Sequence, residues 1–218
     1  MQRLLAIDTT TEFGSLALVE DGGLVQEVPM HSSSGFGHVL YGEIEQLLSR
    51  HGWRLKELDC FACTSGPGSF TGIRVGLAAV KGLGEALGRP VAAVSNLQAM
   101  AWHGSRPMRA TLVDARRGEI YGAVYSSSLE LVLPETVSRL AAWMETLPGG
   151  ELEVLCTDFG PFREGLAGLP MREVPRELAG AVGRIAAARL VAGEVQQPAV
   201  IDANYVRRSD AELFWREW

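Results

Sequence analysis

The same order of predicted elements occurs twice along this chain of 218 residues. Each half opens with an apolar strand that stops at an acidic residue before a turn, over residues 4–8 in the first half and 110–114 in the second. Two further strands with short connections follow each opening strand, and helices then alternate with strands. A repeat of element order indicates two units of one architecture, so we expect two α/β lobes joined near residues 104–107.

The individual elements follow from hydrophobic periodicity. In the first half we expect strands over residues 3–7, 15–19, 24–28, 60–64 and 91–94, and helices over 37–51, 71–87 and 95–103. In the second half we expect strands over 109–113, 120–125, 129–133 and 154–157, and helices over 137–147 and 178–191. Two ribonuclease-H-like lobes explain this order best, as in the actin, sugar-kinase and heat-shock-chaperone ATPase (ASKHA) group. We place the N-terminal lobe at residues 1–104 and the C-terminal lobe at 105–218, and the last long helix can pack back toward the first lobe.

Composition excludes several classes of function. The chain carries 20 Lys and Arg against 26 Asp and Glu, a net charge of −6. This balance disfavours autonomous binding to nucleic acid, because that affinity comes from neutralised phosphates. The three cysteines cannot all pair within the chain and suit a reducing cytosol. We find neither a signal peptide nor an apolar run of about 18 residues, so we expect a cytoplasmic protein without a membrane partner.

Two segments of the first half have the composition of anion-binding turns. Asp8 and Thr9 follow the first strand, where a carboxylate, hydroxyls and amides can hold phosphate oxygens. A glycine-rich segment over residues 65–74 lies between a strand and a helix and can expose backbone amides. It matches neither the Walker pattern nor the dinucleotide-binding pattern. The anion- or nucleotide-binding residues in this interpretation are Asp8, Thr9, Gly66, Gly68, Ser69 and Arg74.

A purely structural interpretation stays open for both segments. The Asp8 turn also fits an Asx turn that starts a hairpin, and residues 65–72 fit a tight junction in which Ser69 caps the following helix. The corresponding turn of the second half, residues 114–121, carries two arginines and a glutamate. Those residues favour a salt-bridged hairpin over a phosphate clamp.

The sequence gives little support to hydrolytic, metal or redox chemistry. None of the four histidines is spaced i, i+4 from another, as a metal site on one helix face requires. The chain has no Gly-x-Ser-x-Gly nucleophile elbow. Cys60 and Cys63 have a redox spacing, but a strand sends side chains three residues apart to opposite faces. We therefore assign no catalytic residue and no metal ligand.

The predicted helix over residues 71–87 is unusual because it contains glycines at positions 72, 76, 82 and 84. Each glycine costs roughly 0.8–1 kcal/mol of helix propensity relative to alanine, so something must offset that cost. One face of the helix is apolar, and a second face consists mostly of small residues that let another helix approach closely. That helix can be an internal neighbour or can belong to another chain.

Four segments together resemble the bacterial TsaB (YeaZ) family. They are Leu-Leu-Ala-Ile-Asp-Thr-Thr at residues 4–10, Gly-Pro-Gly-Ser-Phe-Thr-Gly-Ile-Arg-Val-Gly at 66–76, Asp-Ala-Arg-Arg-Gly-Glu-Ile-Tyr at 114–121 and Tyr-Val-Arg at 205–207. They occur in the family's order across nearly the whole chain. Members of this family are dimerization subunits of the tRNA threonylcarbamoyladenosine machinery.

The resemblance implies a non-catalytic paralogue of the transferase subunit, required for threonylcarbamoylation of the adenosine next to the anticodon in tRNA. The transferase builds its metal site on a His-x-x-x-His helix, where this chain has His38, Tyr41 and Gly42, so at most one of the two histidines is present. The resemblance also implies an ATPase as a third partner, homodimers when the subunit is alone, and only indirect contact with tRNA. We expect no cofactor on this subunit alone, and a nucleotide at the junction between subunits stays an open alternative.

Members of the family pair through two helices of the N-terminal lobe, which correspond here to the helices around residues 40–48 and 71–87. The predicted interface residues are Leu40, Ile44, Leu47, Gly72, Ile73, Gly76, Leu77, Ala79, Val80 and Leu83. Two other functions stay open. One is a small ASKHA-type phosphotransferase, which needs Asp8 and Asp114 to bind magnesium nucleotide. The other is a glycoprotease-like peptidase, against which the missing histidine pair and the missing serine elbow argue.

Overall fold

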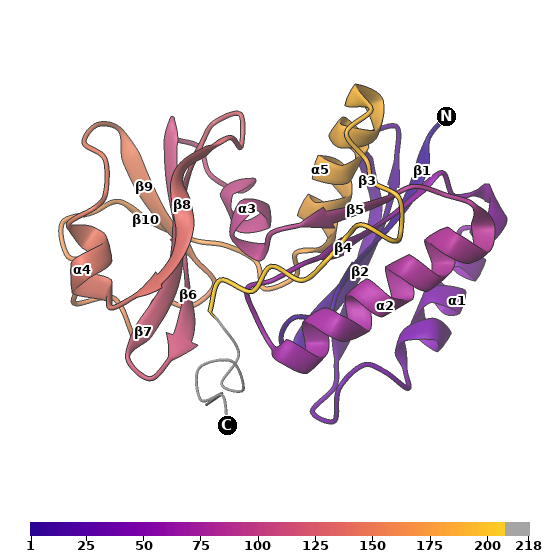
Figure 1. Cartoon of the computed structure of the whole chain (residues 1–218), viewed down its shortest axis with the longest axis horizontal. Coiled ribbons are helices and arrows are strands. Elements are labelled where there is room, and N and C mark those ends of the chain that lie inside the picture. The colour runs from indigo at the N-terminus through magenta and orange to yellow at the C-terminus, as the bar shows by residue number, and fades with distance from the viewer. Residues whose placement is uncertain (208–218) are drawn as a thin grey trace, which may run out of the picture. The chain divides into compact units, whose positions relative to one another are not determined.

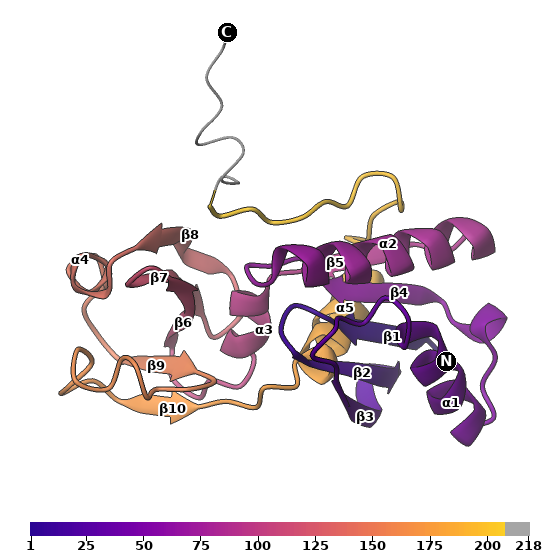
Figure 2. The same cartoon turned by 90° about the horizontal axis from the view of Figure 1, so that it is seen from below.

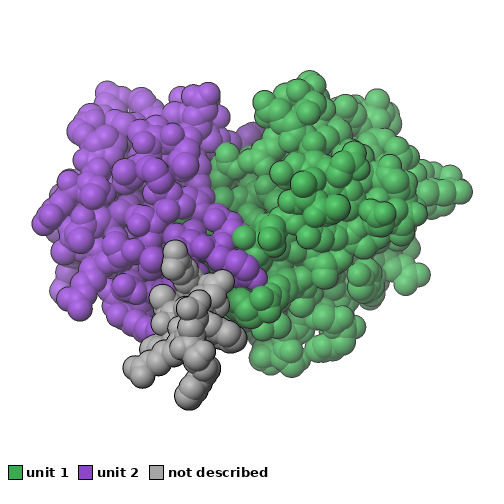
Figure 3. Space-filling view, viewed as in Figure 1, with its two compact units in different colours: residues 1–99, 175–203 green, residues 100–174, 204–218 purple. Residues whose placement is uncertain are grey.

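The computed structural model describes residues 1–207, which form two compact units (Figures 1 and 3). Unit 1 comprises residues 1–99 and 175–203, and unit 2 comprises residues 100–174 and the segment from residue 204. This division differs from the predicted boundaries of 1–104 and 105–218, because residues 175–203 return to unit 1. Each unit contains one mixed five-stranded sheet with helices, so the predicted α/β class with two lobes is confirmed.

The sheet of unit 1 places Asp8 at the end of a buried central strand. Its strands, in the order β3-β2-β1-β4-β5, are β3 (Gly23–His31), β2 (Phe13–Glu20), β1 (Arg3–Asp8), β4 (Cys60–Thr64) and β5 (Val91–Val94). β1 pairs antiparallel with β2 and parallel with β4. Both β1 and β4 are covered on their two faces, which explains why each is an almost continuous apolar run.

Helices cover both faces of this sheet (Figure 2). α1 (Leu40–Arg50) and α2 (Phe70–Leu87) share one apolar core with alternate residues of β1 such as Leu5. α5 (Ala179–Ala192) packs on the other face, where a Cβ at Gly183 would lie 3.2 Å from the Cβ of Ala6. Successive side chains of a strand point to opposite faces, so β1 supplies both cores. None of the helices within residues 1–207 is both long enough and apolar enough to cross a membrane.

The two ends of α2 agree with the helix predicted over residues 71–87. Ser69 is the N-cap, and its hydroxyl accepts a hydrogen bond from the Gly72 N–H at 3.3 Å. Gly88 is the C-cap with φ of 61°, a left-handed conformation that glycine adopts without a steric penalty. The caps thus set where α2 begins and ends.

Trp143 lies in the apolar core of unit 2. Its strands, in the order β10-β9-β6-β7-β8, are β10 (Met171–Glu173), β9 (Leu152–Cys156), β6 (Met108–Arg116), β7 (Glu119–Ser126) and β8 (Leu131–Ser138). Trp143 lies on the short helix α4 (Leu140–Met144) and is buried against Gly122 of β7. The helix predicted over residues 137–147 begins later than expected, because Val137 and Ser138 pair with β7.

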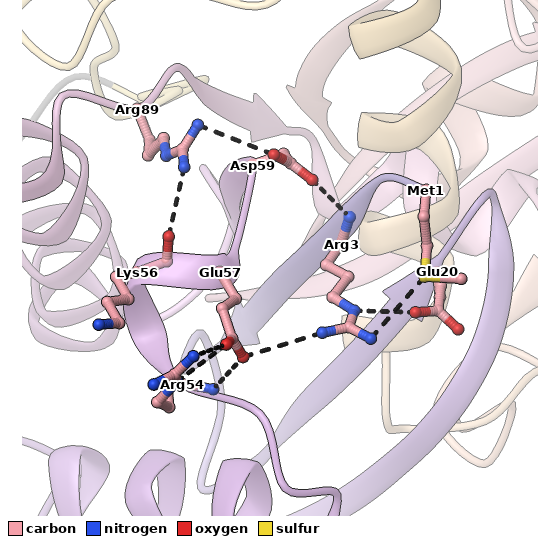
Figure 4. A network of polar contacts seen from close by, with 8 residues as sticks. All are labelled: Met1, Arg3, Glu20, Arg54, Lys56, Glu57, Asp59 and Arg89. Atoms are coloured by element: carbon pink, nitrogen blue, oxygen red, sulfur yellow. Dashed lines mark hydrogen bonds and ion pairs between the residues drawn. The ribbon is translucent and has the colours of Figure 1, made fainter.

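A polar network lies at the end of β1 opposite Asp8 (Figure 4). The Arg3 N–H donates to Asp59 at 2.9 Å, and the Arg3 guanidinium pairs with Glu20 at 2.8 Å and with Glu57 at 3.8 Å. Arg89 pairs with Asp59 from the other side at 3.7 Å. Glu57 belongs to the short 3₁₀ helix η1 (Leu55–Glu57), so these contacts tie the connection between α1 and β4 to the sheet.

Candidate functional site

The turn after β1 is closed around the Asp8 carboxyl group. Asp8 is fully buried, and its Oδ1 accepts hydrogen bonds from the Thr10 N–H at 3.0 Å, the Thr10 hydroxyl at 2.7 Å and the Thr64 hydroxyl at 2.8 Å. The other oxygen, Oδ2, is buried without a hydrogen-bond partner among the described residues. Burial raises the pKa of Asp8 above its ordinary value, and the hydrogen bonds from Thr10 and Thr64 only partly oppose this effect.

The glycine-rich segment packs directly on this turn. The Thr9 hydroxyl donates to the Gly72 carbonyl at 2.8 Å, and the Ser69 N–H donates to the Thr10 carbonyl at 2.7 Å. A Cβ at Gly72 would overlap the Thr9 carbonyl, and one at Gly68 would lie 2.8 Å from the Thr10 carbonyl oxygen. Glycine is therefore required at both positions for the close approach of two backbone segments.

Asn96, at the start of α3 (Asn96–Ala101), completes the junction. Its side-chain oxygen accepts from the Gly66 N–H at 3.0 Å, and its N–H donates to the Gly66 carbonyl at 2.9 Å. Its amide nitrogen donates to the Thr10 hydroxyl at 2.5 Å. We did not predict a role for Asn96, although its position two residues after β5, the strand next to β4, placed it at the same edge of the sheet.

The structure brings five of the six predicted anion-binding residues together, but as an internal junction. Asp8 and Thr9 are buried, and the amides of Gly66 and Ser69 donate to atoms of unit 1. Arg74, the sixth residue, lies on the opposite side of α2 from Gly72, with its guanidinium 3.6 Å from the centre of the Phe70 ring. The structural interpretation of the two turns thus accounts for their observed contacts.

Most of the predicted interface residues face the chain's own sheet. Seven of them lie in the core of unit 1 and are at most 5% exposed: Leu40, Ile44, Leu47, Ile73, Leu77, Ala79 and Val80. Gly76 is also buried, and a Cβ there would lie 2.7 Å from the Thr9 hydroxyl oxygen. Gly72 and Leu83 are half-buried. The apolar faces of α1 and α2 pack against the sheet of unit 1, so these residues hold the two helices in place.

The outer faces of α1 and α2 present different residues to solvent. On α1 they include Tyr41, which is 57% exposed, Gly42 and Glu45. On α2 they include the stripe of Thr71, Arg74, Ala78, Gly82 and Glu85. A Cβ at Gly42 or Gly82 would meet no atom within 4 Å, so neither glycine is needed for packing inside the chain. We call these eight residues the outer helix surface.

The corresponding turn of unit 2 is a salt-bridged hairpin. Asp114 accepts a hydrogen bond from the Arg116 N–H at 2.7 Å, and its carboxylate lies 3.8 Å from the Arg116 guanidinium. Within residues 1–207, no three His, Cys, Asp or Glu side chains are grouped so that they could hold a metal ion. All three cysteines are reduced and buried.

Comparison with known proteins gives one consistent family. A family model described as TsaD, tRNA N6-adenosine threonylcarbamoyltransferase, matches residues 18–167. A Bacillus subtilis (strain 168) protein named tRNA threonylcarbamoyladenosine biosynthesis protein TsaB is 30% identical over 157 residues, which cover 70% of this chain and 69% of that protein. The solved structure of YeaZ from Pseudomonas aeruginosa matches 94% of this chain and 100% of that chain, with a TM-score of 0.79 and 27% identity.

The fold extends to a more distant protein. Component A of (R)-2-hydroxyglutaryl-CoA dehydratase from Acidaminococcus fermentans matches 88% of this chain and 100% of that chain with a TM-score of 0.58. Its sequence identity is 8%, so the likeness concerns the fold alone. The two-lobed α/β architecture predicted from the repeated element order is the one that these proteins share.

Proposed function

Because this chain belongs to the TsaB (YeaZ) family, we propose that it is a non-catalytic scaffold subunit in the threonylcarbamoylation of tRNA. It acts by dimerizing with the catalytic transferase paralogue, and an ATPase subunit joins the two. When the subunit is alone, it forms homodimers. Contact with tRNA falls to the partners, in keeping with the net charge of −6.

The closed Asp8 turn is the observation that most directly supports a non-catalytic role. In a phosphotransferase of this fold, Asp8 and Asp114 would have to reach a magnesium nucleotide. Asp8 is instead fully buried, and its Oδ1 already accepts three hydrogen bonds. Asp114 is committed to the Arg116 turn. The two carboxylates act here as structural groups, and the same geometry disfavours the phosphotransferase alternative.

We assign the pairing to the outer helix surface, which replaces the buried residues first predicted for this role. A stable interface needs roughly 800 Å² per partner, and two adjacent helices can provide it. The TsaD family model matches residues 18–167 of this chain, so the catalytic partner has related helices to offer. Two related surfaces can pair about a pseudo-twofold axis, and a homodimer would use the same surface and compete with the heterodimer.

Ala78→Arg tests this interface. Ala78 is exposed on α2, so the variant should fold normally. In a close helix contact, however, the new guanidinium would be buried without a partner, which is costly. We expect binding to the catalytic paralogue to weaken at least tenfold, about 1.4 kcal/mol, in isothermal titration calorimetry. Gly76→Arg is unsuitable, because Gly76 packs on the Thr9 hydroxyl within unit 1.

Ala188→Arg is the matched control. Ala188 is an exposed alanine of α5, and α5 packs on the opposite face of the sheet from α2. This variant should bind the paralogue like the wild type and should retain the homodimer in light scattering. Unchanged binding by a folded Ala78→Arg would place the interface elsewhere.

We further propose that this subunit alone holds no nucleotide and that a nucleotide binds only at the junction with its partner. The backbone N–H groups of Ser69 and Gly66 support this proposal. They were predicted to bind an anion, but they donate hydrogen bonds within unit 1 instead. Fluorescent ATP analogue should bind to the assembled complex and not to this chain alone. Stoichiometric binding by the isolated chain contradicts the proposal.

A further inference from the structure

Two segments distant in the sequence contact each other in unit 2. They are residues 114–121, which include the β6–β7 turn, and residues 204–207. Arg207 Nη1 donates to the Ala115 carbonyl at 2.9 Å, and Nη2 pairs with the Glu119 carboxylate. The same guanidinium lies 5.7 Å from the centre of the Tyr121 ring. One arginine near the end of the described chain thus holds a backbone carbonyl, a carboxylate and an aromatic ring of one hairpin.

The hairpin has an unusual backbone at this point. The pairing of β6 with β7 shifts register between Asp114 and Arg116, so Ala115 is left without a partner in the ladder. Arg116 and Arg117 then have φ values of 64° and 57°, a left-handed conformation that side-chain-bearing residues rarely adopt in succession. Arg207 supplies a donor to the carbonyl of the bulged residue and a cation beside the end of the turn.

A second polar contact extends the attachment across the sheet. The Asn204 side-chain amide donates to the Glu135 carboxylate on β8, which also accepts a hydrogen bond from the Tyr125 hydroxyl on β7. None of residues 204–207 is buried, and Tyr205 is 43% exposed. Specific polar groups therefore attach this segment to unit 2, with little burial of apolar surface.

The preceding residues are attached to unit 1 in a different way. Gln196 and Val91 exchange two backbone hydrogen bonds of 2.8 Å. Pro198 is buried and packs against Gly84 of α2, and Ile201 is 1% exposed in the core of unit 1. Burial of apolar surface is insensitive to moderate salt, whereas attraction between partly exposed charges is screened by it.

We propose that residues 204–207 are a polar latch on unit 2. Closed through Arg207, the latch holds the left-handed β6–β7 turn in one conformation. It can open while residues 196–203 stay attached to unit 1 and while both sheets stay folded, because its attachment is separate from either core. The inference rests on contacts within unit 2 and is independent of the proposed tRNA-modification function.

Hydrogen–deuterium exchange of the full chain tests the latch through Arg207→Gln. We expect exchange in peptides covering residues 114–121 and 204–207 to become at least tenfold faster. Peptides covering 88–95 and 196–203 should be unchanged. In the wild type, raising NaCl from 50 mM to 500 mM should accelerate exchange in the first two regions only, and the variant should show no further response to salt.

Arg163→Gln is the control, because Arg163 is an exposed arginine elsewhere in unit 2. It should leave all of these peptides at wild-type rates. Arg207→Lys keeps the charge without the planar fork and should give an intermediate effect. Unchanged exchange at 114–121 in Arg207→Gln overturns the latch. A uniform acceleration throughout unit 2 also overturns it, since Arg207 would then be a general folding residue.

Discussion

The contacts of Asp8 determine how its carboxyl group responds to pH. Its Oδ1 is held by three hydrogen bonds, its Oδ2 is buried without a described partner, and burial raises its pKa. An acid whose pKa is raised in the folded state favours folding when protonated. Its contribution is therefore fully present below the unfolded value near 3.8 and is lost as the pH rises through the folded value.

Asp8→Asn should expose this pH dependence. The amide can still accept from Thr10 and Thr64 but does not titrate. As the pH rises from about 4 to 7, the wild type should lose stability relative to the variant. The change in their difference in free energy of unfolding should be about 1.4 kcal/mol for each pH unit by which burial raises the pKa of Asp8. Urea denaturation at several pH values measures the difference. A difference that stays constant with pH means that Asp8 titrates alike in the folded and unfolded chain.

At the scale of elements, a buried carboxylate helps to hold the connection between α3 and β6. Glu153 of β9 is 3% exposed and accepts hydrogen bonds from the N–H groups of Ser105 and Arg106, and Arg172 of β10 pairs with it at 2.9 Å. Burial disfavours its charged form, but the hydrogen bonds from Arg106, Arg172 and Ser105 outweigh that and lower the pKa of Glu153. The predicted connector at residues 104–107 is therefore fixed to the sheet of unit 2.

Glu153→Gln should lower the free energy of unfolding by about 2 kcal/mol near pH 7, because a charged acceptor is replaced by a neutral one. The lowered pKa means that the carboxylate's contribution is present above its unfolded value near 4.5 and is lost as the pH falls through the folded value. The difference in free energy of unfolding between the variant and the wild type should therefore become smaller at acidic pH. Thermal or urea denaturation measures it. Glu151→Gln, at an exposed neighbouring position, should match the wild type at every pH.

At the scale of the whole molecule, α5 attaches a late segment of the chain to strands near its beginning. The Ser15 hydroxyl accepts from the Ala179 N–H at 3.0 Å, and Glu27 accepts from the Gly180 N–H at 2.8 Å. Strand residues thus satisfy the first amides of a helix that has no side-chain cap of its own. A fragment of residues 1–104 lacks α5 and leaves the Ala6 face of its sheet uncovered.

We expect this fragment to show no cooperative thermal unfolding by circular dichroism. A chain in which residues 1–99 are joined to 175–203 by a flexible linker of about 15 residues should unfold cooperatively, since it restores α5. Cooperative unfolding of the 1–104 fragment at the same temperature as the joined chain contradicts the structural division into units.

The local elements and the presence of two lobes followed from sequence alone, while partners distant along the chain were decided by tertiary structure. The strand ending at Asp8, the cap at Ser69 and the stop at Gly88 rest on local chemistry, which a short stretch of sequence contains. The pattern of α2 also required two buried faces, but it could not distinguish the chain's own sheet from another molecule. The contacts of Thr9 with Gly72 and Gly76 place this face of α2 against its own unit. The placement of α5 depended likewise on Ser15, 164 residues before Ala179. Hydrophobic pattern specifies that a surface is buried, whereas the element that buries it is set by contacts that form only in the folded chain.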